Sequence, residues 1–221
     1  MQTAVGVIGL GAMGKGMAQS LRRAGHAVRV FDVRSELVED FARDGGIACA
    51  SVAALASACD VVVSVVVNAA QTEDVLFGSG GGAAAMKKGA VFVMCSTVDP
   101  HWSITLETRL AELGLLYLDA PISGGAARAA SGEMTMMTSG AAAAYAKADP
   151  VLDAMAAKVY RLGNSAGAGS KVKIINQLLA GVHIAAAAEA MALGLREGVD
   201  AAALYEVIMH SAGHRCMCGN R

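Results

Sequence analysis

The sequence lacks a strong charge of either sign, and this absence excludes two classes of protein. It has 18 Lys and Arg against 19 Asp and Glu, a formal net charge of −1. That balance offers no basic surface of the kind that binds DNA or RNA. Charged residues make up 17% of the 221 residues and hydrophobic residues 55%, the opposite of a disordered chain. We therefore expect a folded protein without a nucleic-acid partner.

The sequence also lacks a long uninterrupted apolar run. A membrane-spanning helix needs about 20 consecutive apolar residues, whereas the most apolar short run, 61–67, contains Ser64. Segment 178–195 is apolar but carries His183 and Glu189, and we interpret it as a buried helix of a soluble protein. No basic region precedes the first apolar residues, which argues against a secretory signal. We expect no membrane partner.

Paired cysteines are missing as well. The sequence has 5 cysteines, an odd number, and no C-x-x-C, which is typical of reduced thiols in the cytoplasm. Cys216 and Cys218 form a C-x-C pair near His210 and His214. This spacing matches none of the common zinc templates, so we expect no metal. The 26 glycines show no G-x-y period, which excludes collagen.

Short apolar runs alternate with segments of helical periodicity along most of the chain. This alternation predicts a Rossmann-type, doubly wound and mainly parallel sheet with helices on both faces. The predicted strands are 3–8, 27–31, 61–67, 90–94, 115–118, 134–138 and 158–162. The predicted helices between them are 12–24, 35–43, 51–57, 70–76, 101–113 and 141–156.

The pattern changes near residue 165. SAGAGS at 165–170 is predicted to be a flexible joint. A long helix is expected over 171–196 and a second one over 200–210, with Asp200 as its N-cap. We therefore predict two domains: a dinucleotide-binding Rossmann domain at 1–165 and a partial helical domain at 166–221.

A glycine-rich hexapeptide follows the first predicted strand and opens the first predicted helix. Its residues are Gly9, Leu10, Gly11, Ala12, Met13 and Gly14. G-x-G-x-x-G in this context predicts a loop that binds the pyrophosphate of a dinucleotide at a helix N-terminus. The alternatives are a turn without a ligand and a methyl-donor cofactor on a similar fold.

Asp32 ends the second predicted strand, where an acid that binds the adenosine ribose is expected. A carboxylate there accepts hydrogen bonds from the ribose hydroxyls and repels a 2′-phosphate. The sequence therefore favours NAD over NADP, although Arg34 could weaken the preference.

A second glycine motif, at 119–125, follows the strand 115–118. The Ser123 hydroxyl and the backbone N–H groups of Gly124 and Gly125 could hold a carboxylate at the edge of the sheet where ligands bind. The alternative is an ordinary turn.

Polar residues form a stripe on the long helix. Lys173, Asn176 and Gln177 are spaced i, i+3 and i+4 and share one face, whereas Lys171 lies about 160° away. Lys173 could exchange a proton with a reacting oxygen, and burial would lower its pKa toward the neutral value this role needs. The alternative is a solvated helix start.

Three motifs together resemble the β-hydroxyacid dehydrogenase family, the group around 3-hydroxyisobutyrate dehydrogenase. They are VIGLGAMGKGMA at 7–18, DAPISGGAARAASGEM at 119–134 and GAGSKVKIINQ at 167–177. The resemblance implies that the first loop binds the nicotinamide dinucleotide. It implies that Ser123, Gly124 and Gly125 bind the substrate carboxylate, with Asn176 and Gln177 also on the substrate. Lys173 is then the catalytic acid or base, and the residues implied to line the cofactor cleft are Val67, Asn68 and Thr97.

Within this family, the sequence looks most like the L-threonate dehydrogenase branch. The resemblance implies NAD-dependent oxidation at C2 of L-threonate or a related four-carbon sugar acid, with the proton passing to Lys173. The alternatives are a 3-hydroxyisobutyrate dehydrogenase, a small-aldehyde reductase, and a truncated, inactive NAD-binding protein.

The family carries further helices after the long one, so the resemblance implies a truncated all-helical C-terminal domain here. The apolar face of helix 171–196 then needs a partner, because so large an apolar patch is unusual on a monomer. We expect a homodimer or homotetramer formed through the C-terminal helices.

Overall fold

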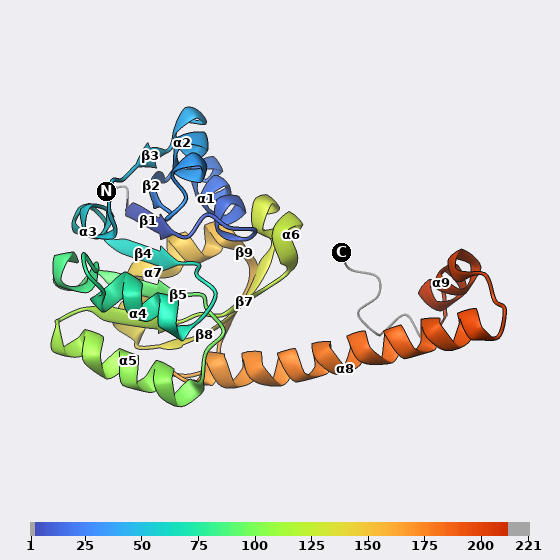
Figure 1. The fold of residues 1–221 in the computed structure, drawn as a ribbon. Coiled ribbons are helices and arrows are strands. Elements are labelled where there is room, and N and C mark those ends of the chain that lie inside the picture. The colour runs from blue at the N-terminus through green and yellow to red at the C-terminus, as the bar shows by residue number, and fades with distance from the viewer. Residues whose placement is uncertain (1–2, 212–221) are drawn as a thin grey trace. The chain divides into compact units, whose positions relative to one another are not determined.

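A computed structural model describes residues 3–211 and shows a sheet with helices on both faces (Figure 1). The strands lie in the order β3-β2-β1-β4-β5-β6-β8-β7, with β9 paired to β8. Strands β1 to β6 are parallel, so their carboxyl ends share one edge. Their bounds are β1 Ala4–Ile8, β2 Ala27–Phe31, β3 Ile47–Ala48, β4 Val61–Ser64, β5 Val91–Met94 and β6 Leu116–Asp119. The prediction of a Rossmann-type, mainly parallel sheet is confirmed.

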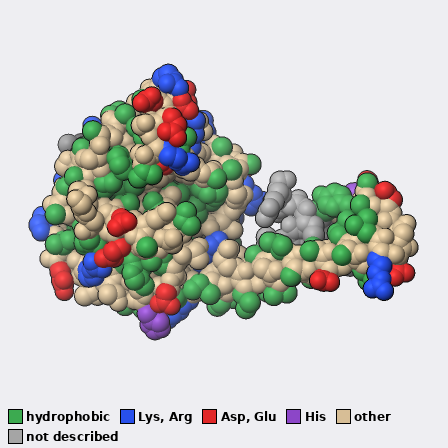
Figure 2. Space-filling model, viewed as in Figure 1, with side chains coloured by type: hydrophobic (Ala, Val, Ile, Leu, Met, Phe, Trp, Pro, Cys, Tyr) green, Lys and Arg blue, Asp and Glu red, His purple; other side chains and the backbone are tan. Residues whose placement is uncertain are grey.

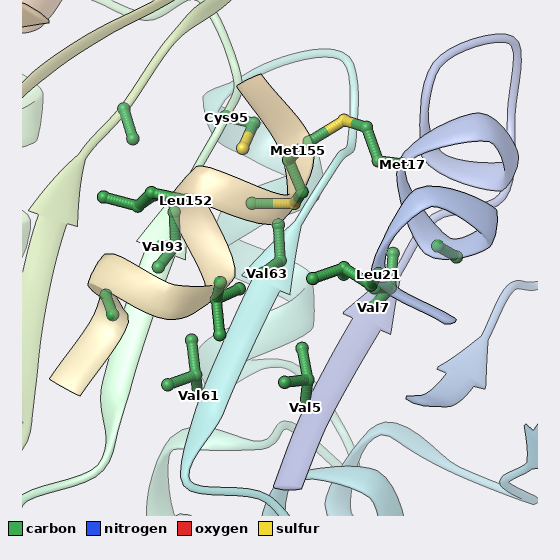
Figure 3. Packing of buried hydrophobic residues seen from close by; sticks show 14 of the residues in the cluster. Val5, Val7, Met17, Leu21, Val61, Val63, Val93, Cys95, Leu152 and Met155 are labelled. Atoms are coloured by element: carbon green, nitrogen blue, oxygen red, sulfur yellow. The ribbon is translucent and has the colours of Figure 1, made fainter. Parts of the chain in front are cut away.

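Two apolar layers hold this sheet between its helices. One layer joins alternate valines of the central strands to α1 (Gly14–Arg23), α2 (Ser35–Arg43) and α7 (Ala142–Met155). Figure 3 shows Val5, Val7, Val61, Val63 and Val93 of this layer packed toward Met17 and Leu21 of α1 and Leu152 and Met155 of α7. The other layer contains α3 (Val52–Ala58), α4 (Ala69–Phe77), the short 3₁₀ turn η1 (Ala83–Ala85) and α5 (Pro100–Glu112). Helices on both faces are what buried parallel strands require.

An antiparallel extension follows β6. Strand β8 (Met134–Gly140) runs antiparallel to β6, and β7 (Ile122–Ser123) pairs antiparallel to β8. Strand β9 (Ala156–Arg161) lies parallel to β8. Helix α6 (Gly125–Ser131) lies between β7 and β8 and packs on α1. Strands β3 and β7 were not predicted, because two residues show no periodic pattern. Helix α6 was not predicted, because its sequence GAARAAS has no stripe of large apolar residues.

The predicted strand 61–67 is too long, since β4 ends at Ser64. Val65 still donates its N–H to the Ile8 carbonyl of β1 at 2.8 Å, whereas the next two valines direct backbone groups to side chains. The Val66 carbonyl accepts a hydrogen bond from Ser96 Oγ at 2.7 Å, and the Val67 N–H donates to Gln71 Oε1 at 2.8 Å. Residues 65–67 therefore form a loop at the carboxyl edge.

The chain divides into two compact units, Met1–Lys173 and Ile174–Arg221. The second contains most of α8 (Ala168–Arg196) and α9 (Ala201–Met209), which Asp200 caps by accepting a hydrogen bond from the Ala203 N–H. The predicted domain boundary at 165/166 lies before this division and stays a prediction.

Helix α8 differs from its prediction in burial. Within the chain, its buried residues are Gly169, Ser170 and Lys173, so the interpretation of 178–195 as a buried helix is wrong for the single chain. By length and composition, α8 is also the one helix within residues 3–211 that could cross a membrane.

Candidate active site

The glycine-rich loop between β1 and α1 has the shape of a phosphate cradle. Gly9 has φ +91°, and a Cβ on Gly14 would lie 1.8 Å from the Gly9 carbonyl oxygen, so neither position accepts a side chain. A Cβ on Gly11 would meet only Arg34 Nη2, at 3.7 Å, and the space above Gly11 is open. No side chain caps the N-terminus of α1 within the described chain, which leaves its N–H groups for an anion.

Asp32 ties the end of β2 to this loop. Its Oδ2 accepts a hydrogen bond from the Leu10 N–H at 2.6 Å, and its Oδ1 accepts from the Arg34 N–H at 2.9 Å. Partial burial raises the pKa of Asp32, but these bonds and the Arg34 guanidinium outweigh burial and lower it overall. The side chain is therefore ionised at neutral pH and keeps free lone pairs for hydroxyl donors.

A cleft of about 370 Å³ opens beside this carboxylate. Four of its lining residues, Gly9, Gly11, Asp32 and Val67, were predicted for cofactor binding. The remaining lining residues are Ile8, Phe31, Val33, Arg34, Val65, Val66, Gln71, Asp74 and Val75. The α4 residues among these share a helix face, but their residue types carry no signal for a binding role.

Four other cofactor predictions lie nearby without lining the cleft. Leu10 contributes its N–H to Asp32 while its side chain is buried in the core. Ala12 and Met13 lie in the loop before α1, and Gly14 opens that helix. The roles of these residues stay predictions.

A polar network fixes the loop after β4. Asn68 caps α4 by accepting the Gln71 N–H at 3.0 Å, and its carbonyl accepts the Thr72 hydroxyl at 3.0 Å. Thr72 Oγ1 in turn lies 3.3 Å from Ser96 Oγ. The predicted residue Asn68 thus shapes the wall of the cleft through the backbone. Thr97 is exposed beside Ser96, and its contact with a cofactor stays a prediction.

The second glycine motif lies at the join between β7 and α6. Ser123 is half-buried and pairs with Thr135 of β8. Gly124 and Gly125 have φ of +145° and +78°, and a Cβ on Gly125 would meet nothing within 4 Å. Gly124 is the N-cap residue of α6, and within residues 3–211 no side chain caps this helix. The arrangement leaves open backbone beside a hydroxyl, and its role in substrate binding stays a prediction.

Lys173 has the most unusual environment of the predicted residues. It is 6% exposed, yet within residues 3–211 no hydrogen-bond acceptor or carboxylate pairs with its ammonium group. Burial lowers its pKa, and no charged neighbour contributes to the shift. A buried, unpaired lysine with a lowered pKa is characteristic of a proton-exchanging site.

Asn176 and Gln177 follow Lys173 on the same helix but belong to the second compact unit. Asn176 is half-buried and Gln177 is exposed. Their roles at the substrate stay predictions.

The segment predicted as a flexible joint is the anchored start of α8. Residues 166, 167, 169 and 170 are buried. Asp119 Oδ2 accepts hydrogen bonds from the N–H groups of Gly167 and Ser170, each at 2.9 Å, and its Oδ1 accepts from Ser170 Oγ at 2.7 Å. The prediction of a flexible joint at 165–170 is therefore wrong for the buried residues 166, 167, 169 and 170. The predicted C-x-C cluster with His214 lies outside the described residues.

Comparisons with known proteins agree with this geometry. Residues 4–163 match the family described as the NAD-binding domain of 6-phosphogluconate dehydrogenase. Residues 167–221 match the family described as NAD-binding of NADP-dependent 3-hydroxyisobutyrate dehydrogenase.

Similar proteins extend beyond this chain. An L-threonate dehydrogenase from Cupriavidus necator is 66% identical over 221 residues, which cover 100% of this chain and 74% of that protein. An L-threonate dehydrogenase from Escherichia coli K12 is 46% identical, with 98% of this chain and 72% of that protein covered.

A solved structure shows the same fold. The 3-hydroxyisobutyrate dehydrogenase from Salmonella typhimurium matches with a TM-score of 0.92 and 47% identity, covering 96% of this chain and 74% of that chain. The sequence families, the relatives and the phosphate cradle agree, and the chain belongs to the 3-hydroxyisobutyrate dehydrogenase-like family of NAD(P)-binding oxidoreductases.

Proposed function

We propose that the protein oxidises L-threonate, or a related four-carbon sugar acid, at C2 with NAD as the hydride acceptor. The observation that carries this proposal is the nearly buried Lys173, which is unpaired within residues 3–211 and lies three residues after Ser170, the partner of Asp119 at the carboxyl end of β6. The substrate follows from the two relatives named above as L-threonate dehydrogenases, 66% and 46% identical.

In such a reaction, different residues of the chain have different roles. Bound NAD supplies the hydride-accepting carbon. The glycine loop holds the pyrophosphate, and Ser123 with the Gly124 and Gly125 backbone holds the substrate carboxylate. Lys173, whose burial lowers its pKa and so favours the neutral amine, takes the proton from the C2 hydroxyl. Asn176 is proposed to orient the substrate.

The preference for NAD over NADP rests on Asp32. Its ionised carboxylate sits in the cleft where an adenosine ribose would bind and repels a 2′-phosphate. Arg34 lines the same cleft, but its Nε lies 3.2 Å from Asp32 Oδ1. This ion pair places the guanidinium beside the carboxylate and offsets part of its positive charge in the cleft.

The test is a substrate panel run with the wild type and Lys173→Ala. The wild type is expected to reduce NAD with L-threonate faster than with 3-hydroxyisobutyrate. Lys173→Ala is expected to bind NADH normally and to lose turnover. A Lys173→Ala variant that retains wild-type turnover would contradict the role of Lys173. A wild type that prefers 3-hydroxyisobutyrate would contradict the proposed substrate.

We also propose that a second copy of the chain covers the apolar residues of α8, giving a homodimer or homotetramer. Figure 2 shows hydrophobic side chains along this helix. Large apolar side chains on it are 51–67% exposed, namely Ile175, Leu178, Leu179, Val182, Ile184, Leu193 and Leu195. Exposed apolar area of this kind marks an interface. We further place the protein in the cytoplasm, in keeping with the free Cys49, Cys59 and Cys95.

A further inference from the structure

A buried carboxylate holds the helix that carries Lys173. Asp119 is 0% exposed and is the last residue of β6. Its two oxygens accept the hydrogen bonds from Gly167 and Ser170 described above, and Ser139 Oγ lies 3.4 Å from Oδ2. Ser139 is the direct ladder partner of Asp119 on β8, and its Oγ accepts the Gly169 N–H at 3.0 Å. Two strands thus bind three backbone N–H groups at the start of α8.

The packing under these bonds brings the helix start into close contact with the sheet. A Cβ on Gly169 would lie 2.4 Å from the Met137 carbonyl oxygen and 2.9 Å from that of Asp119. The helix backbone therefore rests directly on β6 and β8. Just before it, the Ala166 N–H donates to Glu107 Oε2 of α5 at 3.0 Å.

Ser170 and Lys173 lie three residues apart, so they share one face of α8. They are two of the three buried residues of this helix. Asp119 therefore hydrogen-bonds, through Ser170, to the same face of α8 that carries Lys173. Any shift or rotation of the first turn would displace the amine by a comparable amount.

Stability alone does not account for a carboxylate here. Burial raises the pKa of Asp119, and the hydrogen bonds from Ser170, Gly167 and Ser139 offset only part of that effect. The folded state therefore carries a net cost for the ionised group, although a negative charge at a helix N-terminus is itself favourable. Carboxyl groups with a pKa shifted by burial are enriched at functional sites.

We propose that Asp119 is a positioning residue that fixes the first turn of α8, through Ser170, so that the Lys173 amine meets the substrate hydroxyl. This inference rests on the proposed function of Lys173. It requires Asp119 to act on turnover through Lys173 and to leave the distant phosphate cradle unaffected.

A double-mutant cycle tests this requirement, because a residue that acts only through another has no effect once the other is removed. Asp119→Asn keeps the size of the side chain but replaces one acceptor with a donor. We expect Asp119→Asn to lower kcat by about tenfold or more, because misplacing a reacting group by about 1 Å has effects of this order or larger. NADH affinity should change less than about twofold. In the Lys173→Ala background, Asp119→Asn should change the residual single-turnover rate, measured with enzyme in excess over substrate, less than about twofold.

Two variants keep the cycle interpretable. Ser170→Ala removes only the 2.7 Å hydroxyl bond and carries the same test if Asp119→Asn does not fold, with a smaller expected loss of kcat. Asp60→Asn makes the same chemical change at the opposite edge of the sheet, where Asp60 pairs with Lys87 at 2.9 Å, and should leave kcat unchanged.

The outcomes distinguish the positioning role of Asp119 from the proposed function of Lys173. Equal losses from Asp119→Asn in both backgrounds, or no loss in the wild type, would overturn the positioning role alone. Full activity of Lys173→Ala by itself would overturn the proposed function and the positioning role with it.

Discussion

Asp32 Oδ2 lies 2.6 Å from the Leu10 backbone nitrogen, and this contact joins the residue after β2 to the glycine-rich loop. Asp32→Ala should weaken NADH binding at least about tenfold, because hydrogen bonds to a charged group contribute about 1.5–3 kcal/mol each. The ratio of NADPH to NADH affinity should rise, since the repulsion of a 2′-phosphate is removed. Fluorescence titration with both cofactors measures the two effects.

Asp149→Ala serves as the control for this change, because Asp149 forms an ion pair with Arg161 at 2.7 Å outside the cleft. Equal losses of NADH affinity in the two variants would show that Asp32 acts only through stability.

Replacing two glycines of the same loop by alanine should have different effects on melting temperature and NADH affinity. A Cβ on Gly14 meets the Gly9 carbonyl oxygen at 1.8 Å, whereas one on Gly11 has open space apart from Arg34. Gly14→Ala should lower both the melting temperature and NADH affinity. Gly11→Ala should leave the ligand-free melting temperature near that of the wild type and still lose NADH affinity. Calorimetry and titration of the pair separate the roles, and normal NADH binding by Gly11→Ala would rule out the phosphate cradle.

Replacing Lys173 with an apolar residue should stabilise the fold. Burial lowers the pKa of Lys173 from its ordinary value of 10.5, so the folded state binds fewer protons than the unfolded chain between the lowered pKa and 10.5. The cost of the buried ammonium is present below this window and disappears above it. Lys173→Met should therefore raise the free energy of unfolding by about 1–3 kcal/mol near pH 7.

The stabilisation from Lys173→Met should shrink as the pH approaches 10.5. Denaturant unfolding at several pH values measures it. Lys171→Met is the matched control, because Lys171 is exposed on the same helix. A Lys173→Met protein that is less stable than the wild type near pH 7 would argue that the ammonium has a stabilising partner.

The exposed apolar side chains of α8 predict self-association. The wild type should show a molar mass of at least twice 22.3 kDa in light scattering. Leu178 is 67% exposed, and Leu178→Glu should shift the mass toward that of one chain, since a charge in an apolar interface is unfavourable. A wild type that scatters as a single chain at high concentration would contradict the proposed interface.

The sequence predicted most of the sheet, because periodic apolar runs and the G-x-G-x-x-G loop reflect local physical demands. Gly9, Gly11, Gly14 and Asp32 could be placed from spacing alone, since phosphate and ribose recognition occur at fixed points of a Rossmann unit. Strand β7 was not predicted because two residues show no period, and α6 was not predicted because its small residues form no apolar stripe.

The start of α8 could not be predicted in the same way. SAGAGS consists of small residues that are usual in linkers, yet Gly169 is required by close contact with two strands, and Ser170 by Asp119. Both requirements come from β6 and β8, which are distant in sequence. The burial of Lys173 depends on the same tertiary contacts, so spacing indicated its face but not its environment.

The most direct test of the central claim is the initial rate of NADH formation by the full chain supplied with L-threonate and NAD. The wild type should show a clear rate that Lys173→Ala loses while both proteins bind NADH equally well. NADH binding without any oxidation of L-threonate by the wild type would contradict the proposed substrate, and equal rates in the two proteins would contradict the role of Lys173.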